Sequence, residues 1–108
     1  MKTRPITVVE TGIFLRQAEK IWSDEERAAL VDHMARNPEG GDVIPGTGGV
    51  RKIRWNRAGS GKRGGARVIY FNAQDGTIWL LIAYTKAKFD DLPASFIEQL
   101  RQGVEDAL

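Results

Sequence analysis

The apolar positions near the start of the chain follow a helical period in two successive segments. The spacing of the first set predicts a helix over 13–21. Ser23 and Glu26 form a capping box, so a second helix is expected to begin at Asp24. It should end before Pro38, because proline disfavours helical geometry in the residue that precedes it. These two helices are expected to form a hairpin.

Alternation of apolar and polar residues replaces the helical period in most of the remaining chain. A short β-branched strand is expected at 6–10, before the helices. Three further strands are expected at 50–57, 66–73 and 77–85. An Asp-Gly pair between the last two is typical of a tight hairpin, so the three strands should form an antiparallel meander.

Glycine and proline residues indicate the segments that connect the expected helices and strands. Residues 39–49 contain five glycines and are expected to form an extended loop, and a second glycine-rich connection covers 58–65. Pro93 opens a final helix whose apolar stripe could dock on the sheet or on a partner. The order of elements predicts an α+β fold in which a small antiparallel sheet packs against an N-terminal helical hairpin, with a C-terminal helix. The 108 residues are enough for one domain, 1–108.

Composition excludes several classes of protein. The chain has no cysteine and one histidine, so disulfide frameworks and the usual zinc sites are not expected. Its longest apolar run, 78–84, is far shorter than the roughly 20 residues that cross a bilayer. The first residues lack the apolar stretch of a signal peptide. We therefore expect a cytoplasmic protein that does not associate with membranes.

Charge is distributed unevenly, although the net charge is only +2. The window from Val43 to Gln74 holds seven basic residues and no acidic one. These are Arg51, Lys52, Arg54, Arg57, Lys62, Arg63 and Arg67. The rest of the chain holds nine basic and fourteen acidic residues, a balance of −5. A cationic region on an acidic body predicts a polyanionic partner such as nucleic acid.

The strand period gathers part of this charge on one side of the predicted sheet. Ile53 and Trp55 fall on one face of their strand, and Lys52 and Arg54 fall on the other. If the apolar pair faces the helices, the two cations stand together on the open face, close to Arg67 at the start of the next strand. Solvated surface charge is the alternative, but the repulsion between so many cations favours a bound phosphate backbone.

The glycine-rich segment 59–64 formally matches a dinucleotide-binding pattern. That pattern works at the start of a helix, whereas a strand is expected here. A Walker loop is excluded as well, because no Ser or Thr follows Lys62. We interpret the glycines as letting Lys62 and Arg63 reach nucleic acid, with a plain hairpin connection as the alternative.

Three blocks of the sequence closely resemble RelE/ParE-superfamily toxins of the HigB type. The blocks are 37–55, 61–70 and 83–86, followed by Asp91-Leu92, and the most specific stretch reads G-D-V-I-P-G-T-G-G-V-R-K-I-R. The resemblance implies a small sheet packed on helices and ribosome-dependent cleavage of messenger RNA. It also implies a cognate helix-turn-helix antitoxin as a partner, through which alone the toxin would meet operator DNA. No cofactor is implied.

The same resemblance assigns roles to individual residues. Catalytic positions match Lys52, Arg54, Arg67 and Lys86. Apart from the resemblance, we expect further contacts to RNA from Arg51, Arg57, Lys62, Arg63, Tyr84 and Lys88. Relatives often read Tyr-x-Lys-Asn-Glu after the last strand, whereas this chain reads Tyr-Thr-Lys-Ala-Lys, which changes the hydrogen bonding expected after Lys86 but not its charge.

Cleavage of this kind is chemically reasonable without a pair of histidines. The 2′-hydroxyl of RNA attacks the adjacent phosphate, which requires a proton acceptor, a proton donor for the leaving oxygen and positive charge around the transition state. Crowded cations disfavour the charged form of a lysine, so Lys52 or Lys86 is a candidate base. Arg54 and Arg67 would stabilise the phosphorane. Because the basic window lacks carboxylates that could hold magnesium, we expect a metal-independent reaction.

Two other functions remain open at this point. A ParE-like toxin shares the scaffold but inhibits DNA gyrase by protein contact, and the cations would then carry no RNA chemistry. A non-catalytic nucleic-acid-binding module would use the same positive window and leave RNA intact.

Overall fold

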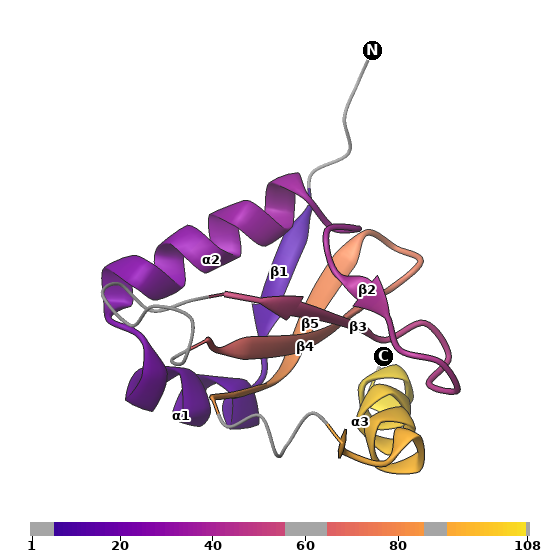
Figure 1. Cartoon of the computed structure of the whole chain (residues 1–108). Helices are drawn as coiled ribbons and strands as arrows, with labels where there is room; N and C mark the ends of the chain where they lie inside the picture. Colours follow the sequence, from indigo (N-terminus) through magenta and orange to yellow (C-terminus); the bar gives the residue numbers. More distant parts are fainter. Residues whose placement is uncertain (1–5, 56–64, 86–90, 108) are drawn as a thin grey trace.

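A mixed β-sheet forms the centre of the structure, with helices on both of its faces (Figure 1). The coordinates are a computed structural model that describes residues 6–55, 65–85 and 91–107. Five strands and three helices lie in these residues: β1 (Thr7–Glu10), α1 (Gly12–Ile21), α2 (Asp24–Arg36), β2 (Asp42–Val43), β3 (Arg51–Arg54), β4 (Arg67–Asn72), β5 (Thr77–Tyr84) and α3 (Ala94–Ala107).

The strands follow the order β1-β5-β4-β3-β2 across the sheet. Strands β3, β4 and β5 are antiparallel neighbours, which confirms the predicted meander. However, β1 pairs with β5 in parallel, with Thr7 opposite Thr77. The expectation of an antiparallel sheet is therefore wrong for β1, and the sheet is mixed. A period of two indicates which side chains share a face but not the direction of the neighbouring strand.

The two N-terminal helices begin where their capping residues predict. The Thr11 side chain accepts a hydrogen bond from the Phe14 N–H at 3.2 Å and donates one to the Leu80 carbonyl at 2.9 Å, which ties the start of α1 to β5. At the start of α2, the Glu26 N–H donates to the Ser23 hydroxyl at 3.1 Å, and the Ser23 N–H donates to the Glu26 carboxylate at 2.9 Å. The predicted capping box is therefore present.

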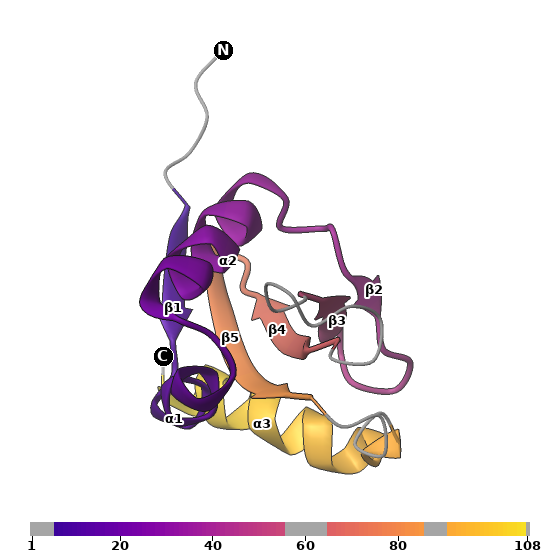
Figure 2. The same ribbon diagram turned by 60° about the vertical axis from the view of Figure 1, so that its left-hand side comes forward.

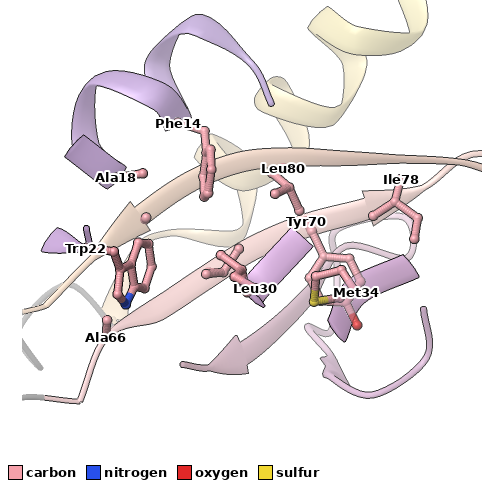
Figure 3. Packing of buried hydrophobic residues seen from close by; sticks show 11 residues of the cluster. Phe14, Ala18, Trp22, Leu30, Met34, Ala66, Tyr70, Ile78 and Leu80 are labelled. Atoms are coloured by element: carbon pink, nitrogen blue, oxygen red, sulfur yellow. The ribbon is translucent and has the colours of Figure 1, made fainter. Parts of the chain in front are cut away.

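Apolar side chains cover both faces of the sheet. On one face Phe14 of α1 and Leu30 of α2 pack with Tyr70 of β4 in a fully buried cluster (Figure 3). On the other face Ile97 of α3 packs against Ile69 of β4. Figure 2 shows α3 beneath the strands, on the side away from α2. Of the two alternatives for the apolar stripe of the last helix, docking on the sheet is therefore the one observed.

The glycine-rich segment before β3 contains a short strand where only a loop was expected. Asp42 and Val43 form the short strand β2, which pairs antiparallel with β3, so the expectation of a loop throughout 39–49 is wrong at these two residues. A strand of two residues is too short to leave an alternating pattern. Several backbone groups of 39–49 find partners in β3, Tyr70 and Arg51.

One arginine anchors α3 to this segment. Arg101 donates from Nε to the carbonyl of the buried Thr47 at 2.9 Å, and its guanidinium pairs with Glu98 and Glu105. Gly48 has φ +75°, and a Cβ there would lie 2.5 Å from Arg101 Nε. Glycine therefore suits this position beside the Arg101 side chain. None of the helices in the described part of the chain is long and apolar enough to cross a membrane.

Candidate functional site

The register of the sheet brings three of the predicted cations onto one face. Arg54 of β3 lies directly opposite Arg67 of β4, and Lys52 lies opposite Ile69 two positions away. Ile53 points to the other face, where it packs against the cluster beneath α1 and α2. The predicted division of this strand into an apolar and a cationic face is confirmed.

The helix α3 covers part of the sheet face that carries the three cations. The helix α3 packs on the same face and contacts β5. Lys52, Arg54 and Arg67 lie beyond this cover, over β3 and β4, where they line a cleft of about 380 Å³. The rest of its lining comes from Gly40, Gly41, Asp42 and Ile53. The cleft is hereafter called the cationic cleft.

Arg67 is the most deeply placed of these cations. Its exposed fraction is 8%, and it donates from Nη1 to the Gly65 carbonyl at 2.6 Å. A guanidinium stays protonated at every physiological pH and carries five N–H donors, so it can bind a backbone carbonyl and an oxyanion at the same time.

A row of three directly opposed residues crosses β3, β4 and β5, and two of the three line the cleft. Arg54 lies opposite Arg67, and Arg67 in turn lies opposite Tyr84 of β5. Side chains in directly opposed positions have Cβ atoms about 4.5–5.5 Å apart, and like charges placed in this way repel each other. An anion with two or more oxygens, such as a phosphodiester, would relieve this repulsion by binding to both guanidinium groups.

The sheet also brings a carboxylate to the cleft that sequence reasoning missed. Asp42 of β2 lies directly opposite Lys52 and lines the cationic cleft. It is the residue just before the acid-free window, and its two-residue strand gives no pattern that would place it beside β3. Only the pairing of β2 with β3 could have revealed it.

Arg51 is placed apart from the other cations. It lies opposite Tyr70, on the face covered by α1 and α2, and donates from Nη1 to the carbonyls of Gly41 at 2.8 Å and Glu39 at 3.3 Å. Its guanidinium therefore holds the backbone that forms one wall of the cleft. The structure does not bring it together with Lys52, Arg54 and Arg67.

Tyr70 holds the same wall from inside the core. Its hydroxyl accepts a hydrogen bond from the Gly41 N–H at 2.8 Å and donates one to the Pro38 carbonyl at 3.0 Å. Burial raises the pKa of the Tyr70 hydroxyl. A Cβ on Gly41 would lie 2.7 Å from the Lys52 carbonyl oxygen and 2.9 Å from the Tyr70 hydroxyl, so the wall can approach β3 this closely only with glycine.

Five predicted site residues lie outside the described part of the chain. Arg57, Lys62 and Arg63 fall in 56–64, and Lys86 and Lys88 fall in 86–90. Tyr84 is described and is buried at the end of the row that starts at Arg54.

The described residues that line the cleft combine one carboxylate with three cations. Within residues 6–55, 65–85 and 91–105, no three His, Cys, Asp or Glu side chains are grouped so that they could hold a metal ion. The chemistry of the cleft therefore suits an anionic ligand better than a cation. A search against protein-family models finds none that matches the chain.

Proposed function

We propose that this protein is an endoribonuclease that cleaves messenger RNA on the ribosome without a metal ion, acting as the toxin of a toxin–antitoxin system. One observation carries the proposal: Arg54 and Arg67 oppose each other in a cleft that Lys52 also lines. The resemblance of the sequence to RelE/ParE toxins of the HigB type supports the same reaction. A helix-turn-helix antitoxin would be the neutralising partner in the cytoplasm, and operator DNA would be reached only through it.

The arrangement suits transphosphorylation of RNA. A phosphodiester bound across Arg54 and Arg67 would present its phosphorus to the adjacent 2′-hydroxyl, and the two guanidinium groups would balance the charge that grows on the pentavalent phosphorus. Lys52 adds a third positive charge at the same cleft. Removing one such donor from an active site lowers the rate constant by about 10²–10³-fold, which sets the scale expected here.

The ribosome would serve both as the source of the substrate and as the docking surface. Ribosomal RNA is a dense array of phosphates, and the cationic region of this chain would bind it through counterion release. On the basis of the sequence, the proposed RNA contacts include Arg57, Lys62, Arg63 and Lys88. Lys86 stays a candidate catalytic residue on the same basis.

Expression of the protein from a tightly controlled promoter tests the proposal. The wild type should arrest growth, and primer extension should show cuts within translated codons. Arg67→Ala should relieve the arrest and remove the cuts, while Arg36→Ala, which removes the same charge from an exposed position on α2, should leave both unchanged. Growth arrest with intact transcripts and inhibited DNA gyrase would favour the ParE-like alternative. RNA that is bound but not cut, even with ribosomes, would favour a non-catalytic module.

A further inference from the structure

Among the described residues that line the cationic cleft, one side chain can accept a proton without first losing one. It is the carboxylate of Asp42, whose neighbours Lys52, Arg54 and Arg67 are all cations. We propose that the Asp42 carboxylate is the general base of the reaction and takes the proton from the attacking 2′-hydroxyl. This inference rests on the proposed ribonuclease function and identifies a catalytic residue that the sequence did not point to.

The pairing of two strands places Asp42 where a base is needed. It lies directly opposite Lys52 in the antiparallel pair of β2 and β3, so the two side chains share the face that carries Arg54. The Asp42 side chain is exposed, so a bound substrate can reach it. None of the ion pairs between described residues involves Asp42.

The backbone that carries Asp42 is firmly held although its side chain is exposed. The preceding residue, Gly41, donates to the Tyr70 hydroxyl through its N–H and accepts a hydrogen bond from Arg51 through its carbonyl. Its close approach to Lys52 leaves no room for a Cβ. A catalytic group gains from such support, because small displacements of the base are costly for proton transfer.

The order of the strands agrees with in-line attack. Asp42 is on the edge strand β2, whereas the two arginines that would hold the phosphate are on β3 and β4. Neighbouring strands lie about 4.8 Å apart, so the base stands to one side of the phosphate site, and the opposite side remains for the leaving oxygen. In-line displacement requires this separation of the attacking and leaving oxygens.

The proposed step is balanced as follows. Asp42 accepts the proton of the 2′-hydroxyl as the bond from O2′ to phosphorus forms. The bond from phosphorus to O5′ breaks, its electron pair stays on O5′, and that oxygen takes a proton from water. The products are a 2′,3′-cyclic phosphate and a 5′-hydroxyl, and Asp42 then returns its proton to solvent. In this step Lys52 supplies positive charge at the cleft and is not the base.

The test compares binding with cleavage in Asp42→Asn. Removing a negative charge from a cationic cleft should leave RNA binding unchanged or tighten it, whereas loss of the base should slow single-turnover cleavage on programmed ribosomes by about 10²-fold or more. Binding is measured with ribosomes that carry mRNA 2′-O-methylated at the cleavage site, which cannot be cut. Asp42→Glu should recover part of the rate. Asp32→Asn, an equal charge change on the exposed surface of α2, should alter neither quantity.

A substrate with sulfur in place of the leaving 5′-oxygen shows whether Asp42 acts as the general base or as the general acid. A thiolate leaves without a proton, so Asp42→Asn should remain slow on this substrate if Asp42 is the base, and its defect should disappear if Asp42 is an acid. Cleavage by Asp42→Asn at the wild-type rate, or a loss of binding as large as the loss of rate, would overturn the assignment. A wild-type protein that binds programmed ribosomes but cuts no mRNA would instead overturn the proposed function itself.

Discussion

Arg54 and Arg67 face each other directly across β3 and β4, and neither can relieve the repulsion by losing a proton. Like charges in directly opposed positions of neighbouring strands repel each other. The sheet register therefore brings two cations together at a cleft that both of them line. A phosphate bound there would be attracted by both guanidinium groups, which is why the pair is central to the functional proposal.

The first prediction concerns the free energy of unfolding of Arg54→Gln. Because Arg54 is exposed, its repulsion with Arg67 is screened, and we expect the variant to be more stable by only a few tenths of a kcal/mol at low salt. Urea denaturation at low and high ionic strength measures this, and the gain should vanish at high salt. A variant less stable than the wild type at low salt would show that the pair is not strained.

The second prediction concerns the salt dependence of RNA binding. The logarithm of the association constant for single-stranded RNA should fall linearly with the logarithm of the salt concentration, by about 0.7 for each phosphate that is neutralised. Lys52→Ala and Arg54→Ala should each reduce this slope by about that amount, and Arg36→Ala should not. Fluorescence anisotropy at four or five salt concentrations gives the slopes. Equal slopes for all four proteins would place the RNA elsewhere.

A third prediction concerns the wall of the cleft. In Tyr70→Phe the buried Gly41 N–H loses its acceptor, so we expect the free energy of unfolding to fall by about 1–3 kcal/mol. The Pro38 carbonyl keeps its hydrogen bond from Asn72, which limits the loss. Thermal and urea denaturation measure the change, and a variant of unaltered stability would mean that this hydrogen bond contributes nothing.

The pH dependence of stability tests the same side chain. Burial raises the pKa of Tyr70 above its ordinary value of 10.0, so the folded state keeps a proton that the unfolded state releases first. The stabilisation from Tyr70 is fully present below pH 10 and is lost as the pH rises through the folded-state pKa. The free energy of unfolding of the wild type should therefore fall above pH 10 more steeply than that of Tyr70→Phe. Parallel curves would contradict this.

A fourth prediction uses two glycines with different surroundings. Gly41→Ala places a Cβ 2.7 Å from the Lys52 carbonyl oxygen, so β2 must move away from β3 and carry Asp42 with it. We expect cleavage to fall with the free energy of unfolding. In Gly103→Ala, a Cβ meets nothing within 4 Å, and the helix α3 should gain about 0.5–1 kcal/mol. Activity and urea denaturation of both variants test the contrast. Full activity of Gly41→Ala would show that the position of β2 does not matter.

The sequence predicts the parts of this structure that local patterns encode. The start of α2 follows from Ser23 and Glu26, whose reciprocal hydrogen bonds depend only on residues three apart. The separation of Ile53 from Lys52 and Arg54 follows from the period of a strand. Both features are confirmed, because neither depends on what the rest of the chain does.

Long-range pairing accounts for what the sequence did not predict. The parallel placement of β1 beside β5 joins residues about seventy positions apart, and nothing within either strand records the direction of the other. Asp42 enters the cleft for the same reason, through a two-residue strand that pairs across a glycine-rich turn. The sequence predicts that Arg54 and Arg67 lie close together. It does not predict that they are directly opposite, because the whole sheet sets the residue-by-residue register.

Single-turnover cleavage of mRNA on purified, programmed ribosomes tests the central claim most directly, with chelator present and with wild type, Arg67→Ala and Arg36→Ala compared at saturating protein. We predict cuts within translated codons for the wild type and Arg36→Ala, and a rate about 10²–10³-fold lower for Arg67→Ala. Intact mRNA with saturating wild-type protein, or equal rates for Arg67→Ala and the wild type, would contradict the claim that the cationic cleft carries out the reaction.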